Sequence, residues 1–217
     1  GKSLEKILTV LTKYNFCENI EISIEANPGT LDFEKTYLLK NAGFNRLSIG
    51  LQTTHIKLLR EIGRIHNYHE FLLNFIMARK IGFDNINVDL IFSLPNQTLE
   101  MWKETLEKVT LLNPDHISSY SLIIEENTKF GYLYHRGELS VPNDEEDRLM
   151  YHESKIYLDS KDYYQYEISN FSKKGFECIH NIGYWKRKEY LGFGLSAHSF
   201  INSTRFRNSD CLDDYLK

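Results

Sequence analysis

Four polar residues stand where short β-rich runs of the sequence end, and their types suit a ligand that carries both charges. Glu25 ends one run, Gln52 follows the next, Arg64 lies in the turn after it, and Asp89 interrupts an apolar third run. Ligands of parallel α/β sheets bind at the carboxyl ends of the strands. Carboxylates accept hydrogen bonds from ribose hydroxyls or an ammonium, and arginine grips a carboxylate through two parallel hydrogen bonds. The set therefore indicates a site for a zwitterion that bears hydroxyl groups.

The same four residues have a purely structural interpretation, which stays open at this point. Glu25 and Arg64 would then form a salt bridge, and Asp89 would satisfy backbone amides. Charged pairs of this kind also occur away from functional sites.

A second candidate site is the segment HNIGYW at residues 180–185. Imidazole is the usual axial ligand of haem iron, and aromatic side chains such as those of Tyr184 and Trp185 suit a flat macrocycle. The alternative is that His180 is a hydrogen-bonded structural residue. The following run, residues 190–199, has two glycines in a strand-like context, which indicates close approach of its backbone to a ligand or another element.

Charge, cysteine content and hydropathy exclude several classes of protein. The chain has 26 Lys and Arg against 30 Asp and Glu, a net charge of -4, so nothing in its composition attracts nucleic acid. Cys17, Cys178 and Cys211 are too scattered for a disulfide framework or for closely spaced cluster ligands, and they fit a reducing compartment. No apolar run approaches the roughly 20 residues that span a bilayer. We therefore expect a cytoplasmic protein without a membrane span.

The elements that must position these residues follow from periodicity. Over residues 1–125, β-rich runs alternate with amphipathic stretches, the pattern of β/α units in a parallel sheet. Expected strands are 21–25, 46–51, 86–91 and 117–124, and expected helices are 32–41, 68–81 and 99–112. Four strands do not close an eight-stranded barrel, which typically needs about 250 residues. The fold class we predict is α/β, a partial TIM-like barrel of parallel strands with a C-terminal extension.

The character of the chain changes after Glu126, with many tyrosines and fewer β/α signals. We divide it into a partial barrel, residues 1–125, and an extension, residues 126–217, that carries the HNIGYW segment. A helix is expected at 145–159, and loops with short strands are expected from 161 to 206.

Seven ordered blocks cover most of the chain: EANPG (25–29), NRLSIGLQ (45–52), IGRIH (62–66), NINVDLI (85–91), LPNQT (94–98), QYEISNF (165–171) and HNIGYW (180–185). In this order they resemble the radical S-adenosylmethionine family of oxygen-independent coproporphyrinogen III oxidases, and more closely its HemW haem-chaperone branch. The resemblance implies a partial barrel whose carboxyl face binds S-adenosylmethionine beside a [4Fe-4S] cluster.

The resemblance also implies roles for individual residues. The family's positions for S-adenosylmethionine match Glu25, Gln52, Arg64 and Asp89, with weaker backbone or packing contacts from Ile123 and His198. The HNxxYW pattern is a haem-binding signature of the chaperone branch and is not typical of the true oxidases. It implies haem binding by His180, Tyr184 and Trp185, with His180 as the ligand of the haem iron.

Three departures from the family shape the functional prediction. The family's CxxxCxxC motif and its GGGTP segment precede the region where this chain begins, its C-terminal domain follows where the chain ends, and Ser93 stands where the family usually has glycine. We therefore expect this chain to be a fragment of a longer protein. The fragment alone should make no radical, and the sequence leaves open whether the intact protein is an enzyme.

The predicted function is that of a haem chaperone, which binds haem and passes it to acceptor haemoproteins. One alternative is an oxygen-independent coproporphyrinogen III dehydrogenase, which converts two propionate side chains to vinyl groups. The other is a nonfunctional remnant that retains the fold.

Overall fold

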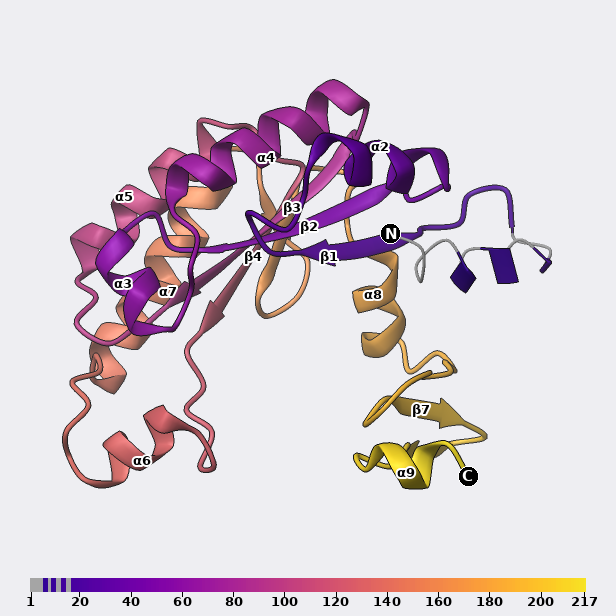
Figure 1. The fold of residues 1–217 in the computed structure, drawn as a ribbon. Coiled ribbons are helices and arrows are strands. Elements are labelled where there is room, and N and C mark those ends of the chain that lie inside the picture. Colours follow the sequence, from indigo (N-terminus) through magenta and orange to yellow (C-terminus); the bar gives the residue numbers. More distant parts are fainter. Residues whose placement is uncertain (1–5, 8, 11–12, 15–16) are drawn as a thin grey trace. The chain divides into compact units, whose positions relative to one another are not determined.

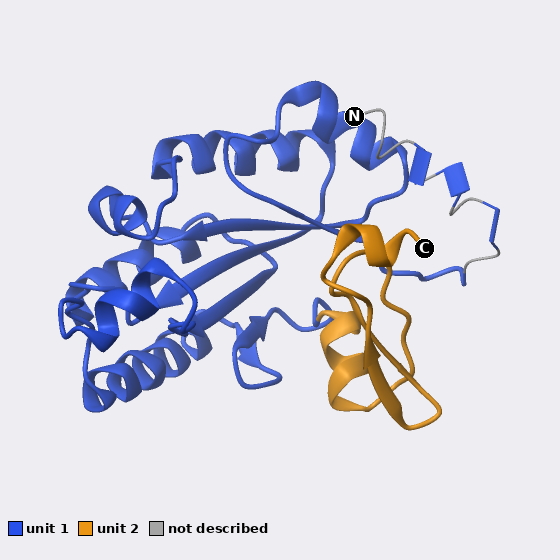
Figure 2. Ribbon diagram, turned by 60° about the horizontal axis from the view of Figure 1, so that its bottom comes forward, with its two compact units in different colours: residues 1–177 blue, residues 178–217 orange. Residues whose placement is uncertain are grey.

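The computed structural model describes residues 6–7, 9–10, 13–14 and 17–217 of the protein. The chain divides into two compact units, one ending at Glu177 and one running from Cys178 to Lys217 (Figure 2). In the described residues, the first unit holds a six-stranded sheet and the second a two-stranded sheet.

The sheet of the first unit has the strand order β1-β2-β3-β4-β6-β5. Its parallel strands are β1 (Ser23–Ala26), β2 (Arg46–Gln52), β3 (Asn85–Phe92) and β4 (His116–Ser121). The short strands β5 (Tyr164–Gln165) and β6 (Asn170–Ser172) extend it in the antiparallel direction. The open, mostly parallel sheet confirms the predicted α/β class, although the fourth strand ends three residues earlier than expected. The two antiparallel strands are too short to produce a periodic signal.

The helices of this unit are α2 (Phe33–Asn41), α3 (Ile56–Glu61), α4 (Tyr68–Ile81), α5 (Leu99–Thr110), α6 (Lys129–His135) and α7 (Asp144–Asp159). Four of them, α2, α4, α5 and α7, cover one face of the sheet (Figure 1). These four lie where helices are predicted. None of the helices in the described parts of the chain is both long and apolar enough to cross a membrane.

Local signals explain why α4 begins and ends where it does. Asn67 accepts a hydrogen bond from the backbone N–H of Glu70, whose carboxylate in turn accepts from the N–H of Asn67. This capping box satisfies two backbone donors that the first turn of a helix leaves free. Gly82 follows the last turn with φ of 105°, a left-handed conformation that glycine adopts without steric cost.

The core lies between the sheet and its helices. Leu47, Ile49, Val88 and Ile117 are fully buried on the helical face of the sheet. Trp102 of α5 is also fully buried, and its indole N–H donates to the hydroxyl of Ser154 in α7 at 2.9 Å and to the carbonyl of Met150 at 3.1 Å. Apolar side chains from sheet and helices thus pack into one cluster that fixes the strands.

The opposite face of the sheet is polar. Successive side chains of a strand alternate between its two faces. The alternate positions Ser48, Asn87, Asp89 and His116 carry the polar groups, and they lie at paired or neighbouring register positions. This face also carries buried polar atoms without a partner among the described residues: Arg46 Nε, Asn85 Oδ1, Asn170 Oδ1 and Ser172 Oγ. The polar face therefore has unused donors and acceptors that suit contact with further polar groups.

The second unit is small. It contains α8 (Ile179–Trp185), the hairpin strands β7 (His198–Ile201) and β8 (Thr204–Arg207), and α9 (Leu212–Tyr215). The HNIGYW segment is therefore helical, whereas loops and short strands are predicted there. His, Asn and Gly are weak helix formers, so propensity alone does not indicate this helix.

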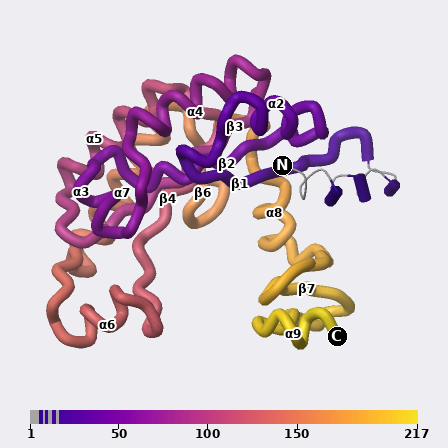
Figure 3. The backbone as a smooth tube through the Cα atoms, viewed as in Figure 1, coloured from indigo at the N-terminus to yellow at the C-terminus, as the bar shows by residue number. Residues whose placement is uncertain are grey.

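The boundary between the compact units differs from the domain boundary drawn at residue 125. After α6, the chain returns to the sheet through α7 and β6. Figure 3 shows this path and labels all three elements. Strand β6 pairs with β4, with Phe171 opposite Ile117. Residues 126–177 therefore belong to the first compact unit, which the change in composition at Glu126 does not reveal.

Candidate functional site

The end of β2 has an unusual backbone that presents Gln52. The register between β2 and β3 shifts between Gly50 and Gln52, and Gln52 has φ of 71°. Its side chain folds back over Gly50, where a Cβ atom would lie 2.8 Å from Gln52 Nε2 and 3.3 Å from Asn27 Oδ1. Gly50 thus provides the space in which Gln52 and Asn27 approach each other. The Gln52 side chain makes no hydrogen bond with a described residue, which leaves its amide available to a ligand.

Arg64 reaches the same cluster from the turn after α3. Its Nη1 donates to Asn27 Oδ1 in a very short hydrogen bond. Among the described residues Arg64 and Glu25 form no ion pair, so the structural interpretation that joined them is wrong. Glu25 lies at the sheet edge in β1, with Ser48 as its register partner, and its side chain is exposed. Its carboxylate is therefore open to a ligand.

Asp89 is held by side chains and not by the backbone amides of the structural interpretation. Ser48 Oγ donates to Asp89 Oδ2 at 2.7 Å, and Asn87 Nδ2 donates to Asp89 Oδ1 at 2.7 Å. Asn87 Nδ2 also donates to Ser48 Oγ at 2.7 Å. An ionised carboxylate has about four lone-pair sites. Each oxygen of Asp89 thus keeps acceptor capacity while its orientation is fixed.

A chain of hydrogen bonds extends from Asp89 to the far strands of the sheet. His116 Nδ1 lies 2.6 Å from Asn87 Oδ1, and His116 Nε2 lies 2.7 Å from the Tyr166 hydroxyl. Burial lowers the pKa of His116 well below 6.5, and the nearby charge of Arg46 lowers it further. A neutral imidazole has one donor nitrogen. Because an amide oxygen only accepts, Nδ1 carries the proton and Nε2 accepts from Tyr166.

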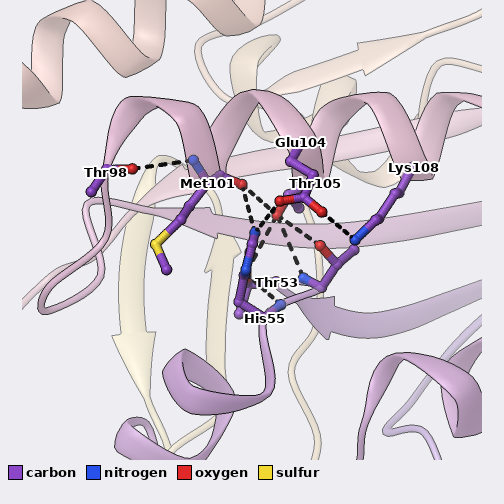
Figure 4. A network of polar contacts seen from close by, with 8 residues as sticks. Thr53, His55, Thr98, Met101, Glu104, Thr105 and Lys108 are labelled. Atoms are coloured by element: carbon purple, nitrogen blue, oxygen red, sulfur yellow. Dashed lines mark hydrogen bonds and ion pairs between the residues drawn. The ribbon is translucent and has the colours of Figure 1, made fainter.

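The turn after Gln52 is tied to α5, as Figure 4 shows. Thr105 Oγ1 lies 3.4 Å from Thr53 Oγ1 and 3.2 Å from Thr54 Oγ1, and it donates to the carbonyl of Met101 at 3.0 Å. His55 Nε2 lies 3.1 Å from that same carbonyl. These contacts fix the segment that leaves β2.

Two further residues hold the neighbouring loops. Asn74 of α4 accepts from the backbone N–H of Gly29 at 2.8 Å and donates to the carbonyl of Leu31 at 3.1 Å. It thereby holds the loop that follows Asn27. His66 is buried with Nε2 3.2 Å from the carbonyl of Leu51, and its burial lowers its pKa. Both residues act on the backbone beside the candidate site.

A cavity of about 480 Å³ opens beside Arg64. Its apolar lining includes Ile91 of β3 and the residues Leu122 and Ile123, which follow β4. Ile123 is mostly exposed at the rim. The cavity adds an apolar wall of the kind that suits a flat ring next to the polar cluster.

The second unit carries the HNIGYW residues on α8. Positions four apart share one helix face, and the rings of His180 and Tyr184 meet edge to face with centroids 4.7 Å apart. Tyr184 in turn contacts Tyr190 at 4.6 Å. The His180 and Trp185 side chains are both exposed. Burial raises the pKa of Tyr184, so its hydroxyl stays neutral at physiological pH.

His198 lies at the start of β7, opposite Arg207 in the hairpin, and is exposed. The close backbone approach predicted for residues 190–199 is confirmed at Gly192. A Cβ atom at Gly192 would lie 2.1 Å from the carbonyl oxygen of His198, a distance that no side chain tolerates. The glycine is required by the packing of this loop on β7.

The described residues contain no group of neighbouring cysteines that could hold an iron-sulfur cluster. Cys17 and Cys211 are exposed and Cys178 is buried, and none of the three is in a disulfide with another described residue. Among the residues placed in the structure, no group of three or more His, Cys, Asp or Glu side chains could hold a metal ion.

Sequence analysis did not single out Asn87 or His116, which orient Asp89. Asn87 and Asp89 are two apart in a strand whose intervening and following residues are apolar, and this spacing places both on one face. That signal is visible in the sequence. The partnership of His116 with Tyr166, 50 residues away, has no local signal.

An open, mostly parallel sheet with helices on one face is a partial (β/α) barrel. Folds of this class bind their ligands at the carboxyl ends of the parallel strands, which is the region of the candidate residues. Comparison with known proteins gives the family. Residues 2–109 match the Radical SAM superfamily. The chain belongs to this superfamily, as the resemblance of its sequence blocks indicated.

The curated relatives include haem chaperones. The chain is 42% identical to "Heme chaperone HemW" of Bacillus subtilis over 196 residues, which are 90% of this chain and 52% of that protein. It is 38% identical to HemW of Lactococcus lactis over 218 residues, 100% of this chain and 58% of the relative. The chain thus spans about half the length of the curated relatives it matches.

A solved structure with the same fold is the coproporphyrinogen III oxidase HemN from Escherichia coli, a radical SAM enzyme. The TM-score is 0.81 at 24% identity, and the match covers 97% of this chain and 51% of that one. At this identity the likeness confirms the fold.

Proposed function

We propose that this chain is the part of a haem chaperone that binds haem and S-adenosylmethionine, and that the intact protein passes haem to acceptor haemoproteins in the cytoplasm. The observation that carries the haem assignment is the exposed imidazole of His180, set against the ring of Tyr184 on one face of α8. The named function of the HemW relatives supports the same proposal.

Haem iron accepts a neutral imidazole nitrogen as its axial ligand. An exposed histidine offers that nitrogen without breaking a buried hydrogen bond. Tyr184 and the exposed Trp185 supply aromatic surface for the macrocycle. His180 is proposed as the iron ligand, and Tyr184 and Trp185 as residues that contact the ring.

The residues of the first unit fit S-adenosylmethionine. Glu25 and Asp89 offer acceptors for an ammonium or ribose hydroxyls, Arg64 offers donors for a carboxylate, and Gln52 offers an unengaged amide. The apolar wall at Ile123 suits the adenine ring. When bound, the cofactor supplies a reducible sulfonium centre. A weak contact of His198 with the same cofactor remains a prediction.

A haem titration tests the proposal. We expect saturable binding, followed by the Soret band, that His180→Ala weakens by at least tenfold. The matched control is His152→Ala, because His152 is also exposed and also meets a tyrosine ring, Tyr151, edge to face, with centroids 5.8 Å apart. Equal affinity of the two variants would contradict the assignment of His180.

The enzyme alternative makes a different prediction. A coproporphyrinogen III dehydrogenase would form protoporphyrinogen from coproporphyrinogen under anaerobic, reducing conditions. We expect no such product from the complete gene product that contains this chain. Its appearance would favour the oxidase over the chaperone.

A further inference from the structure

The second unit contains a cavity of about 360 Å³ that combines aromatic walls with a cationic rim. The aromatic lining residues are Tyr184, Tyr190 and Phe200, and the cationic ones are Arg187, Lys188 and Arg205. The cavity therefore adjoins the face of α8 that carries His180, since the ring of Tyr184 contacts both His180 and Tyr190.

Backbone contacts bring the lining together from three segments. At the end of α8, Arg187 adopts φ of 52°, and the N–H of Lys188 donates to the carbonyl of Gly183 at 2.9 Å. This is the hydrogen-bond pattern that closes a helix with a left-handed residue. Tyr190 and Phe200 exchange two backbone hydrogen bonds of 3.0 and 2.9 Å. The lining is thus part of the fold of this unit.

The third segment is the β7–β8 hairpin, in which Arg205 is the register partner of Phe200. The guanidinium of Arg187 also lies over the Phe200 ring, 5.8 Å from its centroid. Two arginines from different segments therefore flank one aromatic wall.

The three rim cations have no anionic partner in the part of the chain that the structure describes. Among the described residues, none of Arg187, Lys188 and Arg205 forms an ion pair, whereas Arg207 on the same strand pairs with Asp210 at 3.4 Å. Although the whole chain has a net charge of -4, residues 178–217 carry more cations than anions. The cations are Lys186, Arg187, Lys188, Arg205, Arg207 and Lys217, and the anions are Glu189, Asp210, Asp213 and Asp214. The local field attracts an anion.

We propose that this cavity binds the carboxylates of a flat, aromatic dianion, with Arg187 and Arg205 as the main partners and Lys188 as a third. Arginine offers paired N–H donors that match a carboxylate, and the aromatic walls match the ring that carries it. Applied to haem, the inference rests on the proposed function and assigns the propionates to this rim. It adds a carboxylate subsite that does not depend on iron.

Metal-free protoporphyrin and its dimethyl ester separate this subsite from iron ligation. The two probes share the ring, but only the free acid has carboxylates. We expect the chain to bind the free acid at least tenfold more tightly than the ester, as measured by porphyrin fluorescence. The double variant Arg187→Gln/Arg205→Gln should lose this preference.

Arg207→Gln is the matched control, because it neutralises an arginine of the same strand that does not line the cavity. It should keep the preference for the free acid. Circular dichroism of each variant shows whether the hairpin still folds. Lys188→Gln adds a rim variant whose substitution lies outside the hairpin. No preference for the free acid, or a preference that all rim variants retain, would overturn the inference.

The outcome for iron is independent. If His180→Ala leaves haem affinity unchanged while the rim variants lose the free-acid preference, the assignment of His180 fails and the carboxylate subsite stands. If His180 is required for haem and the rim variants behave like Arg207→Gln, the proposed function stands and the carboxylate subsite is overturned.

Discussion

The side-chain amide of Asn87 donates a 2.7 Å hydrogen bond to the carboxylate of Asp89, two residues further along the same strand. The same amide accepts from the buried, neutral His116. His116 in turn accepts from the Tyr166 hydroxyl. In this series of hydrogen bonds, from Tyr166 to His116 to Asn87 to Asp89, each donor points toward Asp89. The polar face of the sheet is therefore organised around one carboxylate.

Replacing Asn87 should loosen this carboxylate. In Asn87→Ala, Asp89 loses one donor and His116 Nδ1 loses its acceptor in a buried position, which costs about 1–3 kcal/mol of unfolding free energy. We expect S-adenosylmethionine affinity, measured by calorimetry, to fall by about fivefold or more. Asn45→Ala is the control, because Asn45 bonds only the backbone at Ile20 and Ile22, away from the site. Unchanged affinity in Asn87→Ala would show that Asp89 does not need this support.

Stability should fall in mild acid because two histidines are buried in the neutral form. Burial lowers the pKa of His66 and of His116 below 6.5. The unfolded chain then binds more protons than the folded one, so the free energy of unfolding rises with pH. This contribution is fully present above about pH 6.5, the pKa of an unperturbed histidine, and is lost as the pH falls below that value.

Urea denaturation between about pH 7.5 and about pH 5.5 measures this slope. His66→Gln should reduce it, because one of the two buried histidines is removed. His69→Gln, which replaces an exposed histidine, serves as the matched control. A stability that does not vary over this range would contradict the assigned protonation states.

Gly50 should be essential for the position of Gln52. In Gly50→Ala, the new methyl group would lie 2.8 Å from Gln52 Nε2, so the Gln52 side chain must move. We expect S-adenosylmethionine affinity to fall by about tenfold while the core stays folded. Gly183→Ala is the control, because no atom lies within 4 Å of a Cβ placed there. If both variants bind the cofactor equally well, Gln52 does not contact it.

Local sequence signals predicted the parallel strands and the helices between them. They did not predict the pairing of β5 and β6 with the parallel strands. The Asn67–Glu70 capping box and Gly82 mark both ends of α4 in the sequence itself. Strands of two and three residues, such as β5 and β6, have no periodicity to detect, so their pairing beside β4 depends on tertiary contacts.

The candidate site shows the same division. The end of one expected strand indicated Gln52, and a carboxylate inside an apolar run indicated Asp89. The hydrogen bond from Tyr166 to His116 joins residues 50 positions apart. Only the folded sheet brings β4 and the segment after β5 together, which no spacing in the sequence encodes.

Electron paramagnetic resonance of the ferric haem complex tests the central claim most directly, because it reports the axial ligand of the iron. We expect the spectrum of an imidazole-ligated haem in the unmodified chain. His180→Ala should lose this spectrum, and added free imidazole should restore it. A complex whose spectrum is the same with and without His180 would contradict the claim that this residue holds the haem iron.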